Sequence, residues 1–150
     1  MASSLTNLLF HVVFSTKKRA QLITNEIRRD LEQYLGGIVR MEGGVALDIS
    51  CPCDHAHIIL RLPASRAVSD IVRIIKTNSS RWLNKQRRIQ GKFAWQSGYS
   101  AFSVSESVLP EVRAYVRNQD EHHRNRTFQE EFRLLLEKHQ IKFDERYIWD

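Results

Sequence analysis

Two histidines separated by one residue are the feature of this sequence that most directly suggests chemistry. His55 and His57 open an apolar run that ends at Leu62, and such a run predicts a β-strand. Side chains at positions i and i+2 of a strand point to the same face, with Cα atoms roughly 6.6 Å apart, so two imidazoles at this spacing can bind one metal ion. The alternative interpretation is a pair of partly exposed histidines on a sheet edge.

Two cysteines precede the histidines with the same alternation. Cys51, Cys53, His55 and His57 together suggest zinc, but an extended segment of this length spans roughly 20 Å, whereas zinc ligands lie ~2.0–2.3 Å from the ion. One straight strand cannot place all four around one ion, although a kink at Pro52 keeps the zinc alternative open. We expect the cysteines to be structural, and two are too few for a disulfide scaffold.

A tyrosine and a glutamine four residues apart form the second candidate site. Tyr115 and Gln119 lie in a segment with helical periodicity, and residues four apart stack on one face of a helix. A tyrosine hydroxyl can act as a nucleophile toward phosphorus, and an amide oxygen can bind a hard metal ion. The alternative is that Tyr115 is only the edge of an apolar stripe.

Motifs of other enzyme classes are absent from the sequence. There is no G-x-x-x-x-G-K-[ST] phosphate-binding loop, no G-x-S-x-G nucleophile elbow and no H-E-x-x-H metalloprotease motif. Any chemistry that breaks a nucleic-acid strand must therefore proceed without nucleotide hydrolysis, and we expect no nucleotide cofactor.

Positive charge is concentrated in one segment of the chain. The net charge is +6, yet residues 61–92 contain nine basic side chains and one acidic side chain, so the rest of the chain has a small acidic surplus. A basic surplus confined to one segment suggests a polyanionic partner, most simply nucleic acid. A solvated helix face is the alternative.

Length and composition are typical of a globular protein. With 150 residues, 42% of them hydrophobic, the chain is long enough to bury a core, and we expect residues 1–150 to form a single domain. No apolar run approaches the ~20 residues that span a bilayer. Positive charges follow the N-terminal apolar run 8–14 instead of preceding it, unlike a signal peptide. We therefore expect a cytoplasmic protein without a membrane partner.

The apolar patterns predict the order β-α-β-β-α-β-α-α. Strands are predicted over 7–14, 45–50, 57–62 and 101–105, the second and third forming a hairpin. Helices are predicted to begin near residues 24, 68, 107 and 127. Gly36 and Gly37 are expected to weaken or end the first, Ser107 to cap the third, and a capping box at Thr127 to begin the fourth. The tail 140–150 is expected to be irregular.

This order predicts an α+β fold. The first six elements match a split βαβ, ferredoxin-like (RRM-like) βαββαβ core, in which an antiparallel sheet has helices packed on one face. The last two elements are additional C-terminal helices. No repeat, linker or low-complexity tract interrupts the chain.

Ordered motifs along nearly the whole chain resemble those of one family. The matching stretches are Phe10–Lys17, Asp54–Ile58, Ile75–Trp82, Phe93–Tyr99, Ala101–Ser105, Tyr115–His123 and Asp144–Trp149. The chain is similar to the single-tyrosine HUH transposases of small bacterial insertion sequences, relatives of the REP-associated tyrosine transposases. Ala56 and the two cysteines depart from the family pattern without removing a catalytic residue.

The resemblance implies a role for each candidate residue. His55 and His57 match the HUH histidines, which bind a divalent cation, usually Mg²⁺ or Mn²⁺, while Tyr115 matches the nucleophile and Gln119 the third metal ligand on the nucleophile helix. The implied reaction cleaves and rejoins single-stranded DNA at hairpin-bearing element ends through a covalent 5′-phosphotyrosine. The family further implies a homodimer whose active sites are shared between subunits, acting at the bacterial nucleoid.

The basic segment is the expected DNA-binding surface of such an enzyme. Its residues predicted to bind the DNA backbone are Arg73, Lys76, Arg81 and Lys85. Trp82, Trp95 and Tyr99 are candidate stacking platforms for bases, although Trp82 is also a candidate core residue. The alternative function is a non-catalytic nucleic-acid-binding module of ferredoxin-like fold, such as a domesticated relative.

Overall fold

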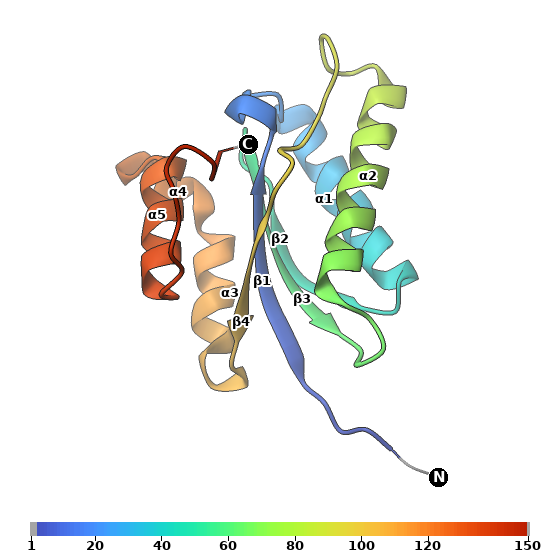
Figure 1. The fold of residues 1–150 in the computed structure, drawn as a ribbon. Helices are drawn as coiled ribbons and strands as arrows, with labels where there is room; N and C mark the ends of the chain where they lie inside the picture. The colour runs from blue at the N-terminus through green and yellow to red at the C-terminus, as the bar shows by residue number, and fades with distance from the viewer. Residues whose placement is uncertain (1–2, 150) are drawn as a thin grey trace.

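The sheet has the predicted four strands in a ferredoxin-like order. The computed structural model describes residues 3–149. Strands β1 (Leu8–Ser15), β2 (Val45–Ser50), β3 (His55–Leu62) and β4 (Ser100–Val104) pair antiparallel in the order β2-β3-β1-β4 (Figure 1). Because β1 and β2 are both antiparallel to β3, they run parallel to one another with β3 between them. This is the split βαβ arrangement that the sequence predicted.

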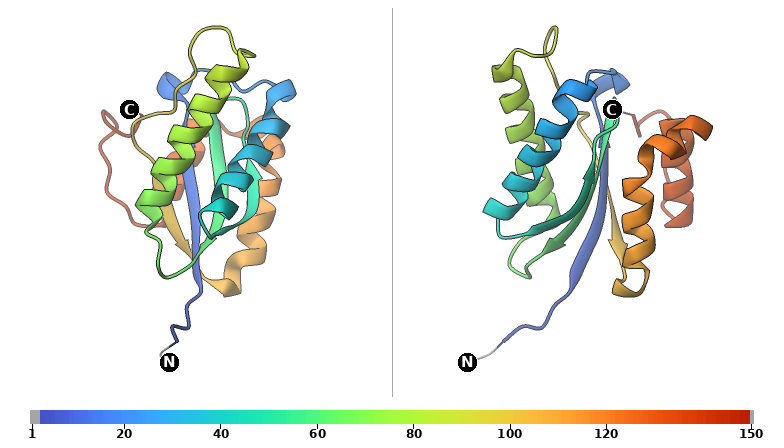
Figure 2. Two further views of the ribbon diagram at one scale, coloured as in Figure 1. Left: turned by 90° about the vertical axis from the view of Figure 1, so that its right-hand side faces the viewer. Right: turned by 180° about the vertical axis from the view of Figure 1, so that it is seen from behind.

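Two helices, α1 (Asn25–Met41) and α2 (Val68–Gln86), cover one face of the sheet (Figure 2). Of the two effects expected of Gly36 and Gly37, the ending of the first helix is wrong, because the helix continues to Met41. Each glycine costs roughly 1 kcal/mol relative to alanine. Ile38 and Val39 are buried just beyond them, and burial of each contributes about 1.5–3 kcal/mol, so packing stabilises the last turn.

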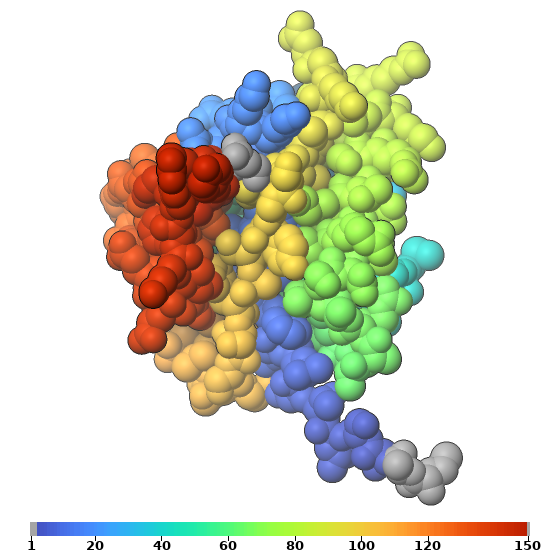
Figure 3. Space-filling model, in the orientation of Figure 1, coloured from blue at the N-terminus to red at the C-terminus, as the bar shows by residue number. Residues whose placement is uncertain are grey.

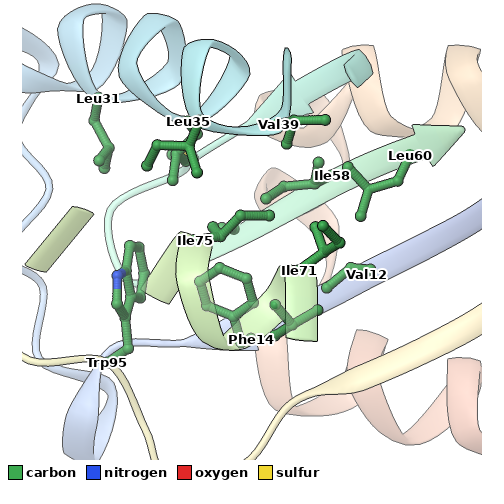
Figure 4. Packing of buried hydrophobic residues seen from close by; sticks show 14 of the residues in the cluster. Val12, Phe14, Leu31, Leu35, Val39, Ile58, Leu60, Ile71, Ile75 and Trp95 are labelled. Carbon is green, nitrogen blue, oxygen red and sulfur yellow. The ribbon is translucent and has the colours of Figure 1, made fainter. Parts of the chain in front are cut away.

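The main hydrophobic core lies between these helices and the sheet. Figure 4 shows side chains of β1 and β3 facing those of α1 and α2; its labelled residues are Val12, Phe14, Leu31, Leu35, Val39, Ile58, Leu60, Ile71, Ile75 and Trp95, all buried. Alternate residues of a strand point to opposite faces. Since Ile58 and Leu60 face α1 and α2, His55 and His57 point to the other face.

Three helices, α3 (Leu109–Arg117), α4 (Gln119–Asn125) and α5 (Phe128–Lys138), lie on that other face (Figure 2). The 3-10 turns η1 (Lys17–Arg19) and η2 (Glu106–Val108) follow β1 and β4. Ser105, and not Ser107 as predicted, is the capping residue, because its side chain accepts a hydrogen bond from the backbone N–H of Ser107. The predicted cap at Thr127 is confirmed, with Oγ1 accepting from Glu130 N at 3.2 Å.

Tyr115 and Gln119 do not lie on one continuous helix, contrary to the prediction. Between α3 and α4, Asn118 has φ −98° and ψ 26°. The Nε2 amide of Gln119 donates to the backbone oxygen of Tyr115 at 3.3 Å. In an uninterrupted α-helix the same carbonyl accepts from the backbone N–H of residue 119.

The segment that follows α5 is irregular, as predicted, and packs against that helix. Phe143, Ile148 and Trp149 contact the cluster that contains Phe128 and Phe132. Figure 3 shows α5 and this segment separated from α2 by the chain that leads into β4. Within residues 3–149, no helix is long and apolar enough to cross a membrane.

Candidate functional site

His55 is held in one tautomer with an unpaired ring nitrogen. It begins β3, which lies inside the sheet, and its side chain is buried, so the alternative of exposed histidines on a sheet edge is wrong. Nδ1 lies 2.7 Å from Oδ1 of Asp54; because a carboxylate only accepts, Nδ1 donates. Nε2 is left as an acceptor, and it is buried with no hydrogen-bond partner among the residues that the structure describes.

His57 connects a third histidine to a buried carboxylate. Its Nδ1 lies 2.9 Å from Nε2 of His11, and its Nε2 lies 2.8 Å from Oε1 of Glu131. Burial, reinforced by neighbouring histidines, lowers the pKa of both His57 and His11 well below the ordinary value. Both imidazoles are therefore neutral at neutral pH, which is the form that binds a metal ion.

Glu131, on α5, is the member of the site that the sequence analysis missed. The residue is 2% exposed. Oε1 lies 4.0 Å from Nε2 of His55, and Oε2 lies 3.3 Å from Nε2 of His123. The ligand atoms of His55, His57 and Glu131 all lie within 4.8 Å of one another, so one metal ion can bridge them.

Tyr115 lies beside the same cluster. Its ring centroid is 5.9 Å from that of His57 and 6.2 Å from that of His11. Burial, and then the negative charge of Glu131, raises the pKa of Tyr115. The phenol is therefore protonated at neutral pH and must lose its proton to act as a nucleophile.

Gln119 completes the group of predicted site residues. It is buried, its Oε1 lies 3.1 Å from Nε2 of His123, and its hydrogen bond to His57 opposes the effect of burial on the pKa of that imidazole. The structure thus brings the predicted nucleophile and its three predicted metal ligands together within one chain.

Two clefts open next to this cluster. The first has a volume of about 470 Å³; Tyr115, Glu131 and His11 line it together with aliphatic side chains of β4, α3 and α5. The second has a volume of about 460 Å³ and is lined by His55 and by polar side chains of α1 and α4. Tyr115 and His55 are thus each reached from a cleft, whereas His57 lines neither.

Comparison with known proteins establishes the family. The family model described as IS200-like transposase matches residues 4–119. The chain belongs to this transposase family. The ISDra2 transposase TnpA of Deinococcus radiodurans is 24% identical over 117 residues, which are 75% of this chain and 84% of the relative. The transposase of insertion sequence element IS200 from Salmonella typhimurium is 26% identical over 124 residues, 79% of this chain and 81% of the relative.

Solved structures agree with the fold of this IS200-like transposase. A crystal structure of a Deinococcus radiodurans protein assigned as a transposase has a TM-score of 0.65 at 23% identity, covering 79% of this chain and 95% of that chain. A REP-associated tyrosine transposase bound to a REP hairpin has a TM-score of 0.59 at 17% identity, and the match covers 82% of this chain and 74% of that chain. The predicted family is confirmed, and its members are enzymes that cleave DNA.

Part of the candidate site lies beyond the family match. The match ends at Gln119, whereas Glu131 comes from α5. Neither cysteine belongs to the histidine cluster: Cys51 lies in the main core and Cys53 is exposed. The cluster therefore differs from the zinc alternative and contains a carboxylate contributed by the C-terminal segment.

The predicted DNA-binding residues of the transposase lie on the side of the sheet opposite to the histidine cluster. Arg73, Arg81 and Lys85 are exposed on α2, which covers the sheet face away from the histidines (Figure 2). Lys76 is half-buried, donates from Nζ to the backbone oxygens of Ser97 and Gly98 at 3.1 and 2.8 Å, and has its pKa lowered to about 8 by burial. The structure does not bring these four residues to the site.

The basic surface of α2 can be tested by salt dependence. If Arg81 and Lys85 bind phosphates, each change to alanine should lower the slope of log affinity against log salt by ~0.7 on single-stranded DNA or ~0.9 on a duplex stem. Arg88→Ala is the control, because its guanidinium is already paired with Asp30 at 2.7 Å. Equal slopes for all three variants and the wild type would assign α2 to the solvated-face alternative.

Two of the three aromatic stacking candidates pack inside the protein. Trp95 is buried and lies edge-on to Phe14, so its prediction as a stacking platform is wrong. Trp82 stacks on Tyr34 with ring centroids 4.4 Å apart, in agreement with the core alternative. Tyr99 is 39% exposed and stays a candidate.

Proposed function

We propose that this transposase cleaves and rejoins single-stranded DNA through a covalent bond to Tyr115. The observation that carries the proposal is the position of Tyr115, which lines a cleft beside a buried group of imidazoles and a carboxylate. In cleavage, the phenol loses its proton and its oxygen forms a bond to phosphorus. The bond to the 3′ oxygen breaks, so a 3′-hydroxyl leaves and the 5′-phosphate stays on the tyrosine. Attack by a second 3′-hydroxyl rejoins the DNA without nucleotide hydrolysis.

The donor atoms at the site fit a divalent cation. Nε2 of His55 is buried and unpaired within residues 3–149, His57 is neutral, and Gln119 and Glu131 supply oxygens. Mixed imidazole and oxygen ligands suit Mn²⁺, and hard oxygens suit Mg²⁺. We propose His55 and His57 as ligands, with Gln119 or Glu131 as the third; a bound cation polarises the phosphate oxygens.

The proposed substrate is single-stranded DNA that carries an imperfect hairpin. One structural relative is bound to a REP hairpin, and the net charge of +6 favours a polyanion. The test is incubation with hairpin-bearing strands, labelled at the 3′ end, in Mg²⁺ or Mn²⁺. A labelled adduct that survives denaturation supports the proposal. Hairpin binding without any adduct would instead support the non-catalytic alternative.

The homodimer stays a prediction, and the place of its active sites can be tested by mixing variants. Because Tyr115 lies beside His57 of its own chain, we expect His57→Ala and Tyr115→Phe proteins to be inactive both separately and as verified heterodimers. A site shared between subunits would pair one intact histidine strand with one intact tyrosine helix. An adduct formed by the heterodimer would therefore refute the single-chain site and support the exchange that the family resemblance implied.

A further inference from the structure

One positively charged side chain lines both clefts. Arg126 follows α4 and lines both the cleft of Tyr115 and the cleft of His55. Its side chain is exposed, and the guanidinium has no ion pair or hydrogen bond within residues 3–149. By contrast, Arg28 in the second cleft is paired with Asp120 at 2.8 Å. The guanidinium of Arg126 is thus available to an anionic ligand.

The backbone at Arg126 is anchored to the histidine site. Its extended conformation, φ −154° and ψ 135°, makes the connection between α4 and α5. Thr127 then caps α5, and the ring of Phe128 stacks on His55 with centroids 4.0 Å apart. The side chain therefore starts from a fixed point beside the cluster, although it extends into solvent.

Negative charge near Tyr115 opposes the approach of a phosphate, and a positive side chain offsets part of it in addition to the proposed divalent cation. Asp54 and Glu131 place two carboxylates on the histidine pair, and a phosphodiester that approaches the phenol adds a third negative group. Lys138 also lines this cleft. Arg126 differs from Lys138 in that it lines both this cleft and the cleft of His55.

We propose that Arg126 binds the phosphate that Tyr115 attacks. This proposal rests on the proposed tyrosine chemistry and adds to it a catalytic residue from outside the family match, which ends at residue 119. A guanidinium donates two parallel hydrogen bonds to phosphate oxygens. It orients the phosphate toward the phenol and stabilises the negative charge that grows on phosphorus in the transition state.

The first test measures single-turnover adduct formation by Arg126→Ala, Arg126→Lys and Lys138→Ala. Loss of one donor to transition-state charge lowers rates by roughly 100-fold or more, so we expect that loss for Arg126→Ala. Arg126→Lys should recover part of the rate, because it keeps the charge but not the planar fork. Lys138→Ala, in the same cleft, should show only the small loss that follows removal of an exposed charge.

The second test does not require cleavage. In the Tyr115→Phe background, single neutral methylphosphonates are scanned along the hairpin-bearing strand, and affinities are compared with and without Arg126→Ala. We expect one position at which the methylphosphonate weakens binding only when Arg126 is present. Equal adduct rates for Arg126→Ala and Lys138→Ala, or a scan without such a position, would overturn the assignment. Absence of an adduct with the wild type refutes the tyrosine chemistry, and the scan still decides the role of Arg126.

Discussion

The Tyr115→Phe variant is expected to form no covalent adduct with single-stranded DNA while it still binds the hairpin. The change removes the oxygen that forms the bond to phosphorus and keeps the ring that packs beside His57 and His11. Loss of one hydrogen-bonding hydroxyl should alter the free energy of unfolding by no more than about 1.5 kcal/mol. Adducts are measured on denaturing gels, hairpin affinity by titration, and folding by thermal unfolding.

Two other tyrosines provide matched controls for this result. Tyr147 is 65% exposed, and Tyr34 stacks on Trp82 on the opposite layer; each change to phenylalanine should leave adduct formation at the wild-type level. An adduct formed by Tyr115→Phe, together with its loss in either control, would assign the nucleophile to another tyrosine. Loss of hairpin binding in Tyr115→Phe would show that the variant reports on folding or binding instead of chemistry.

The sheet and the histidine pair could be predicted because both depend on local alternation. The i, i+2 spacing of His55 and His57 placed them on one face, as observed. Their burial was not predicted, because an imidazole is polar and the sequence does not say which strand becomes internal. The helix break at Asn118 was not predicted either, since the Tyr115 and Gln119 spacing is the same in a continuous and in an interrupted helix.

Glu131 shows where sequence reasoning reached its limit. The signal was present: an acidic residue stands inside the apolar stripe of α5, among Phe128, Phe132 and Leu136. The role of this residue depends on the surface against which the apolar face of α5 packs. That surface is not evident from the sequence, because the contact with His57 joins residues 74 apart in the chain. The same limit applies to α2: its basic residues are visible in the sequence, but the layer in which they lie relative to the histidines is a tertiary property.

Removal of the metal ligands is expected to have the second large effect. His57→Ala should lose both Mn²⁺ binding and adduct formation, by more than the roughly 10–100-fold that loss of an outer partner of a metal ligand costs. Mn²⁺ binding is measured without DNA, as the increase in the free energy of unfolding. At an ion concentration of 100 times the Kd, this increase is about 2.7 kcal/mol. A chelator should abolish adduct formation by the wild type, and excess Mn²⁺ should restore it.

Variants of Glu131 and Gln119 then identify the third ligand. We expect Glu131→Gln to weaken Mn²⁺ binding more than Gln119→Ala does, because it removes a full negative charge whose Oε1 lies 2.8 Å from Nε2 of His57. The amide of Glu131→Gln keeps the size of the side chain and its ability to hydrogen-bond, so folding should persist. A larger loss of Mn²⁺ binding in Gln119→Ala would instead identify Gln119 as the third metal ligand, as the family resemblance implied. Adduct formation that is insensitive both to chelation and to His57→Ala would remove the metal from the proposed reaction altogether.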